Sequence, residues 1–168
     1  MDEVKALIFD VFGTVVDWRT SVARTAKEFA KSHGIPEADW VQFACDWRAL
    51  YQPSMEKVRS GGLPFTKLDT LHRMNLDEIA REYGLSNLPK EALDELNLAW
   101  HQLSPWPDSI KGLTMLKSCF IIGTHSNGNI ALMVNLAKYS GLPWDVILGA
   151  EVVRQYKPVP ETYDRCCD

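Results

Sequence analysis

One stretch near the start of the sequence limits what this chain can fold into more than any other. Residues 4–9 form a short, nearly continuous apolar run that is rich in large and β-branched side chains. Such a run is typical of a strand that is buried on both faces of a parallel sheet. Asp10 follows directly, and Gly13 allows the chain to turn soon afterwards. The stretch therefore predicts an α/β protein with a carboxylate at the carboxyl end of its first strand.

A carboxylate at that place is suited to chemistry. In open α/β sheets, ligands bind in the crevice beyond the carboxyl ends of the strands. Asp10 could also do no more than terminate a strand, and the apolar run alone does not separate the two interpretations. Other parts of the sequence have to decide between them.

Two further stretches favour a site. A second apolar run, residues 119–124, leads into Ser126 and Asn127. Farther along, two prolines restrict the backbone around Lys157. A carboxylate, a hydroxyl and amide pair, and a cation thus occur in the order strand, strand, loop before a helix.

These three stretches resemble motifs of the haloacid dehalogenase superfamily, and specifically of its type II 2-haloacid dehalogenases. The motifs are FDVFGT at 9–14, SNGN at 126–129 and YKPVPETY at 156–163. The resemblance covers most of the chain and keeps the order of the family. It implies a Rossmann-like parallel sheet core with an inserted all-helical cap. It also implies a hydrolase that cleaves carbon–halogen bonds through an aspartyl ester.

The pattern of apolar residues predicts how the chain is divided. The core is expected in residues 1–17 and 104–168, and an all-helical block in residues 18–103. Helical periodicity in that block covers residues 20–33, 36–51, 67–83 and 89–103. In the second part of the core, strands are expected at 119–124 and 144–149, and helices at 108–117, 128–140 and from 160 onward. A block inserted between two strands of a parallel sheet is expected to lie over the crevice, as a cap.

The resemblance implies a role for each matching residue. Asp10 matches the nucleophile, which attacks the halogen-bearing carbon and forms an ester that water hydrolyses. Lys157 matches a lysine close to that nucleophile. Ser126 matches a donor to the substrate carboxylate. Asn127 matches a residue that holds the halide or orients the site.

Other positions also match the family. Thr14 and Tyr163 fall on family positions near the carboxylates. Arg48, in the helical block, resembles the cap arginine that accepts the departing halide. Without the resemblance, an arginine on an amphipathic helix is more often a solvated surface charge. His125 stands where the family has an apolar residue, and we interpret it as a departure that changes the pocket rather than as a catalytic base.

Phe12 separates two classes of reaction. Phosphatases of the superfamily carry a second aspartate at this position, because an alkoxide leaving group is protonated by a general acid as it departs. Phe12 has no proton to donate, and a halide needs none to leave. The sequence therefore favours dehalogenation with no metal ion and no other cofactor, and with Phe12 lining the substrate and halide pocket. A non-catalytic relative that binds a small acid or a protein is the alternative, and a phosphatase is a weaker one.

Composition limits the partners. A content of 46% hydrophobic and 24% charged residues is that of a globular protein, and a net charge of -4 without a basic tract argues against nucleic acid. No apolar run could span a bilayer, and the first residues do not resemble a signal peptide. The expected partner is a small 2-haloalkanoic acid. The four cysteines lack metal-binding spacing, so reduced thiols and a cytoplasmic location are expected; they are Cys45, Cys119, Cys166 and Cys167.

The sequence also predicts an incomplete core. Members of the resembled family continue beyond the position of Asp168 into a further strand that carries an acidic motif. The strands that follow would flank the first strand, so residues 4–9 are expected to form an exposed apolar edge. The chain would then be a fragment, a truncated product or a chain whose edge a partner covers. Aggregation or a homodimer through that edge, with weak activity, is expected.

Overall fold

The computed structural model describes residues 4–167, with the exception of the Cys167 side chain. The chain folds into two compact units. The sheet unit contains the described residues up to Asp17 and from Leu103 onward, and the helical unit contains Trp18–Gln102. The sequence had placed Leu103 in the helical block. It belongs to the sheet unit, where it is fully buried and its carbonyl accepts a hydrogen bond from the Ser140 hydroxyl.

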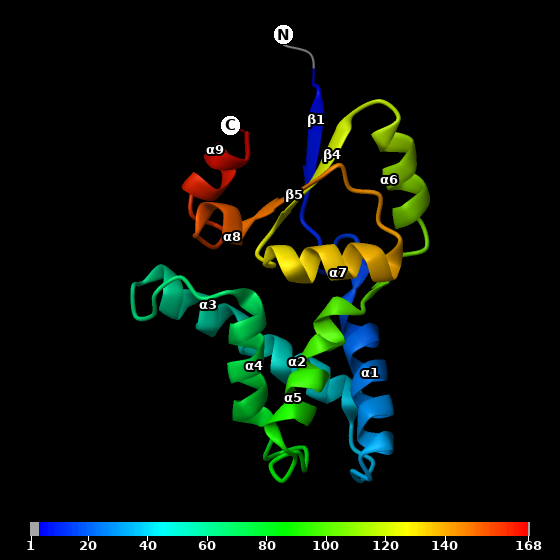
Figure 1. Cartoon of the computed structure of the whole chain (residues 1–168), viewed down its shortest axis with the longest axis vertical. Coiled ribbons are helices and arrows are strands. Elements are labelled where there is room, and N and C mark those ends of the chain that lie inside the picture. The colour runs from blue at the N-terminus through cyan, green and yellow to red at the C-terminus, as the bar shows by residue number, and fades with distance from the viewer. Residues whose placement is uncertain (1–3, 168) are drawn as a thin grey trace. The chain divides into compact units, whose positions relative to one another are not determined.

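Three parallel strands in the order β1-β4-β5 form the centre of the sheet unit (Figure 1). The predicted α/β fold with a parallel sheet is confirmed. The strands are β1 (Ala6–Phe9), β4 (Ile121–Ser126) and β5 (Val146–Gly149), with a separate antiparallel pair of β2 (Val16–Asp17) and β3 (Ser104–Pro105). The helices of this unit are α6 (Ser109–Lys117), α7 (Ile130–Ser140), α8 (Ala150–Val153) and α9 (Glu161–Cys167).

The strand register brings the carboxyl ends of the three strands together. Phe9 lies opposite Thr124, and Ser126 lies opposite Gly149. Gly149 has a φ of 146°, and a Cβ atom on it would lie 2.1 Å from the Ser126 carbonyl oxygen. Only glycine allows β5 to approach the end of β4 this closely. The segments that follow β1 and β4 therefore start at the same edge of the sheet.

β1 forms one edge of this sheet. It pairs with β4, and no other strand among residues 4–167 pairs with its opposite side. Its side chains alternate between exposed and half-buried, and Ile8 is 39% exposed, whereas Ile122 of the central strand β4 is fully buried. Burial of residues 4–9 on both faces is therefore wrong for this structure, because the face of β1 that carries Ala6 and Ile8 is exposed. The expectation of an exposed apolar edge agrees with these side chains.

The described residues of the helical unit contain helices and loops and no strand. The helices are α1 (Trp18–Ser32), α2 (Trp40–Ala49), α3 (Tyr51–Arg59), α4 (Leu68–Ile79), α5 (Lys90–Asn97) and the 3-10 helix η1 (Leu98–His101). No helix among residues 4–167 is both long enough and apolar enough to cross a membrane. Cys45 and Cys166 are half-buried thiols and Cys119 is an exposed one, none of the three in a disulfide, while the Cys167 side chain lies outside the described part.

The pattern over 36–51 predicted one helix, and the structure has a different arrangement there. α2 begins at Trp40 because the Asp39 carboxylate accepts hydrogen bonds from the first turn, including the Gln42 N–H at 2.9 Å. The helical run then breaks at Leu50 and resumes as α3. Pro53 explains the break. Proline has no N–H, so the helical hydrogen bond from residue 53 to the carbonyl of Ala49 cannot form.

An aromatic cluster fills the core of the helical unit. The His72 ring stacks on Trp100 with ring centroids 4.3 Å apart, and Trp47 donates its indole N–H to the His72 carbonyl at 2.8 Å. His72 is buried, and neither ring nitrogen has a hydrogen-bond partner among the described residues. The pKa of His72 is lowered to about 3, mainly because burial disfavours the charged ring; the charge of Asp69 opposes this shift, and the positive charge of Arg48 adds to it. His72 is therefore neutral at physiological pH.

This buried histidine predicts how stability depends on pH. The folded pKa lies below the unfolded value of 6.5, so its contribution is fully present above pH 6.5 and is lost as the pH falls. We expect His72→Phe, which keeps a stacking ring, to reduce the loss of unfolding free energy between pH 7 and pH 5 by about 2 kcal/mol. Urea unfolding at the two pH values measures this loss. His33→Gln, at an exposed histidine of the same unit, serves as the control. An unchanged loss in His72→Phe would contradict the assignment.

Candidate functional site

Asp10 lies directly after β1, and both of its carboxylate oxygens accept hydrogen bonds. Lys157 Nζ donates to Oδ1 at 2.7 Å, and Thr14 Oγ1 donates to Oδ2 at 3.0 Å. The same Lys157 Nζ donates to the His125 carbonyl oxygen at 2.8 Å. The Asp10 side chain remains 44% exposed. The carboxylate is therefore held in orientation by two donors and is still open to a small molecule.

A tight turn after Asp10 returns Thr14 to the carboxylate. Gly13 has a positive φ of 87°, and its N–H donates to the Val16 carbonyl at 3.0 Å. Trp106 donates its indole N–H to the Gly13 carbonyl at 3.2 Å, and this hydrogen bond stabilises the turn. Sequence reasoning did not find Trp106, because nothing in its local pattern relates it to a turn 93 residues earlier.

Ser126 and Asn127, which follow at the end of β4, are both buried. The Ser126 hydroxyl oxygen accepts the Gly128 N–H at 3.1 Å, which leaves its own O–H as a donor. The Asn127 side-chain oxygen accepts the backbone N–H of Lys157 at 2.8 Å. Asn127 thus ties the segment that carries Lys157 to the end of β4, and this contact supports an orienting role.

His125 and Tyr163 pack against each other beside Lys157. Their rings meet edge to face, with centroids 4.7 Å apart. His125 Nε2 lies 3.0 Å from the Thr162 carbonyl oxygen. A neutral imidazole protonated at Nε2 can donate a hydrogen bond to this oxygen. Burial lowers the pKa of His125, and the charge of Lys157 lowers it further. A neutral ring with this nitrogen engaged supports a packing role for His125 rather than a role as a base.

Phe12 and Arg48 complete the set of sequence-predicted residues. Phe12 is half-buried in the turn after Asp10, and its backbone forms a bridge with Val16. Arg48 lies in α2 of the helical unit, half-buried, with its guanidinium carbon 3.7 Å from the centroid of the Tyr51 ring. The structure thus brings Asp10, Thr14, Ser126, Asn127, Lys157, Tyr163 and Phe12 into one unit. The role of Arg48 at the halide stays a prediction.

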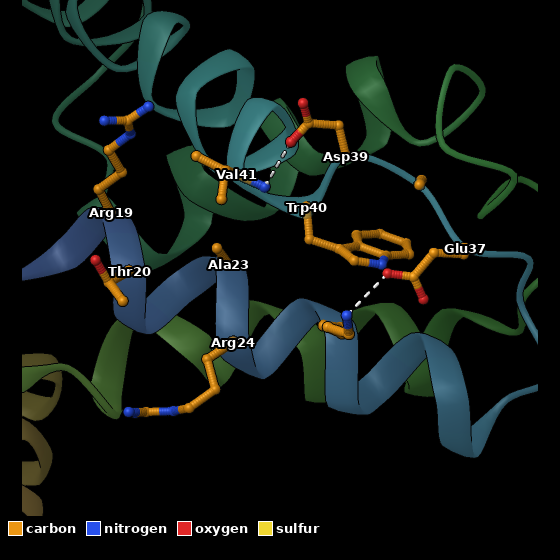
Figure 2. Close-up of a pocket in the computed structure, with 10 residues that line it drawn as sticks. Arg19, Thr20, Ala23, Arg24, Glu37, Asp39, Trp40 and Val41 are labelled. Atoms are coloured by element: carbon orange, nitrogen blue, oxygen red, sulfur yellow. Dashed lines mark hydrogen bonds and ion pairs between the residues drawn. The ribbon is translucent and has the colours of Figure 1, made fainter.

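The helical unit also contains an open pocket of about 560 Å³ between α1 and the start of α2 (Figure 2). None of the predicted site residues lines it. Three of the residues that line it make polar contacts: Lys27 forms an ion pair with Glu37 at 3.0 Å, and the Asp39 carboxylate caps α2. No group of three or more His, Cys, Asp or Glu side chains suited to a metal ion occurs among residues 4–167.

Comparison with known proteins gives the family. Residues 4–168 match the family model described as haloacid dehalogenase-like hydrolase. The chain belongs to this family. It is 30% identical over 171 residues to (S)-2-haloacid dehalogenase 4A of Burkholderia cepacia, a match that covers 100% of this chain and 70% of that protein.

Two solved structures of the haloacid dehalogenase family are similar over almost the whole chain. One is a defluorinating L-2-haloacid dehalogenase with 51% identity and a TM-score of 0.94, covering 98% of this chain and 68% of that one. The other is an L-2-haloacid dehalogenase with 40% identity and a TM-score of 0.93, covering 98% of this chain and 70% of that one. The predicted superfamily and the predicted class of hydrolase are confirmed. The individual roles around Asp10 depend on the geometry described above.

Replacement of Lys157 should separate chemistry from stability. The Lys157–Asp10 pair is partly exposed, and such pairs contribute little to folding, at most about 1 kcal/mol. We expect Lys157→Met to lower halide release by at least about 100-fold while Tm changes by only a few degrees. Lys111→Met, on α6 of the same unit, is the matched control and should keep its activity. Near-normal turnover in Lys157→Met would show that the ammonium is dispensable.

Proposed function

We propose that this chain is a 2-haloacid dehalogenase that hydrolyses the carbon–halogen bond of a short 2-haloalkanoic acid through an ester on Asp10. The observation that carries the proposal is the Asp10 carboxylate, held by Lys157 and Thr14 and followed two residues later by Phe12 instead of a general acid. The haloacid dehalogenases to which the chain is similar support the choice of substrate.

In the first step, one Asp10 carboxylate oxygen attacks the carbon that bears the halogen. The carbon–oxygen bond forms as the carbon–halogen bond breaks, and the halide leaves with the bonding electron pair. No proton is needed, so Phe12 is no obstacle. In the second step, water adds to the ester carbonyl and the acyl–oxygen bond breaks. One proton of the water goes to the departing oxygen of the 2-hydroxy acid, and the other goes to solvent as the Asp10 carboxylate is restored.

The first step brings two anions together, because the substrate carries a carboxylate of its own. At about 4 Å and an effective dielectric constant near 20, their repulsion is about 4 kcal/mol. Lys157 offsets this repulsion at Asp10. The Ser126 hydroxyl, whose proton remains free to donate, is proposed to bind the substrate carboxylate.

The departing halide needs a partner as its charge develops. Arg48 of the helical unit, the proposed cap, is proposed to accept it, with Asn127, Phe12 and Tyr163 lining the pocket. A homodimer and a cytoplasmic location complete the proposal.

Asp10→Asn should abolish halide release from 2-chloropropanoate and leave Tm nearly unchanged, because an amide is a far weaker nucleophile of the same size. Mass spectrometry of wild-type protein quenched during turnover should find an ester on the peptide that contains Asp10. Asp108→Asn, at an exposed carboxylate of the same unit, is the matched control. An ester on another carboxylate would refute the assignment of the nucleophile.

Phosphatase chemistry should be absent. With Phe12 in place of a general acid, we expect no more than trace hydrolysis of p-nitrophenyl phosphate in the presence of magnesium. A chelator should leave halide release unchanged. Strong magnesium-dependent phosphate release, or loss of halide release with the chelator, would favour the phosphatase alternative.

A further inference from the structure

His125 lies on a face of the sheet whose apolar side chains are exposed. Side chains alternate along a strand, so Ile121, Gly123 and His125 share one face of β4. A Cβ atom on Gly123 would meet Val146 of β5 and Ile8 of β1, so these two side chains lie on the same face. Ile8, Ile121 and Val146 are between 38% and 56% exposed. His125 is only 5% exposed, so this face is covered at the end of β4.

The first turn of α9 provides this cover. His125 Nε2 lies 3.0 Å from the Thr162 carbonyl oxygen, and the His125 ring meets the Tyr163 ring edge to face at a centroid distance of 4.7 Å. Because a carbonyl oxygen only accepts hydrogen bonds, the contact with Thr162 requires a proton on Nε2. The His125 side chain thus holds α9 in two ways, by a hydrogen bond and by an aromatic contact.

The backbone of His125 contacts the other end of the same segment. Its carbonyl oxygen accepts a hydrogen bond from Lys157 Nζ at 2.8 Å. Between the two ends, two prolines restrict the backbone, and the Thr162 N–H donates to the Val159 carbonyl at 3.0 Å. One residue of β4 therefore holds residues 157–163 at both ends, with its carbonyl at the first end and its ring at the second.

We propose that His125 is a positioning residue whose ring fixes Tyr163 as a wall of the substrate site in the sheet unit. The inference rests on the proposed function, in which Tyr163 lines that site. Lys157 is held by the backbone carbonyl of His125, which a change of side chain keeps. Loss of the ring therefore weakens substrate binding and leaves the chemical step at Asp10 nearly unchanged. A wall contributes equally to the bound substrate and to the transition state, so its displacement raises KM more than it lowers kcat.

Replacement of His125 by leucine tests this division between KM and kcat. His125→Leu should raise KM for 2-chloropropanoate about 10-fold and leave kcat within about 3-fold of wild type. Ile122→Val, at a fully buried residue on the opposite face of β4, is the matched control and should lower Tm while KM stays unchanged. An unchanged KM in a folded His125→Leu protein overturns the proposal. A loss of kcat as large as that expected for Lys157→Met overturns it as well.

Two further replacements isolate the hydrogen bond and cover the case in which His125→Leu does not fold. His125→Phe keeps a ring of similar size without the donor, and should raise KM about 5-fold. His125→Gln keeps a side-chain N–H that can donate to the Thr162 carbonyl, and should have a KM within about 2-fold of wild type. Equal KM values for His125→Phe and His125→Gln would overturn the proposal.

Hydrogen exchange tests the position of α9 without any turnover. The Thr162 and Tyr163 N–H groups donate to the carbonyls of Val159 and Pro160, so they exchange slowly while the first turn is held. In His125→Leu and His125→Phe, both amides should exchange about 10-fold faster, while the amides of α7 keep their rates as an internal control. His125→Gln should restore the wild-type rates. Unchanged exchange in His125→Leu and His125→Phe would overturn the inference.

The exchange measurement separates this inference from the proposed function. If the wild-type protein releases no halide from haloacids, the proposed function fails, and exchange alone decides whether His125 holds α9. Faster exchange in His125→Phe that is restored in His125→Gln then supports this hold. If halide is released and neither KM nor exchange depends on the side chain at position 125, the inference alone is overturned.

Discussion

The ammonium group of Lys157 is the contact on which the rest of the site depends. It donates to Asp10 Oδ1 and to the His125 carbonyl, and so joins the segment after β1 to the end of β4. The backbone N–H of the same residue donates to Asn127. A single residue thus connects three segments that are far apart in the sequence. Because the ammonium donates to a backbone carbonyl as well as to Asp10, the carbonyl still holds it in place when the Asp10 carboxylate loses its negative charge.

The close approach of the strand ends makes this arrangement possible. A side chain on Gly149 would collide with the Ser126 carbonyl, so the distance between β5 and β4 depends on that glycine. Parallel pairing then aligns the residues that follow each strand at one edge. The sheet therefore supplies the geometry, and hydrogen bonds from Lys157 and Thr14 supply the orientation of Asp10.

Sequence reasoning was effective where a single physical rule determines the result. Apolar runs that end in polar residues predicted which strand ends would carry the site, and Asp10 and Lys157 do meet there. It was wrong about the start of α2, because Pro36 and Asp39 are both plausible first residues and only the structure shows which N–H groups are capped. The sequence could not predict the contact of Arg48 with Tyr51 or the burial of His72, since both depend on packing between helices.

The two units orient their cations by different physical means. In the sheet unit, Lys157 is a compact charge with three donors, and oxygen acceptors are sufficient to place it. In the helical unit, Arg48 is a flat cation, and the Tyr51 ring against its face restricts the plane of the guanidinium. An ammonium can be placed by oxygen acceptors alone, because its three donors point in different directions and can be shared between Asp10 and a backbone carbonyl. A planar guanidinium can in addition be oriented through its face, because that face carries no donor.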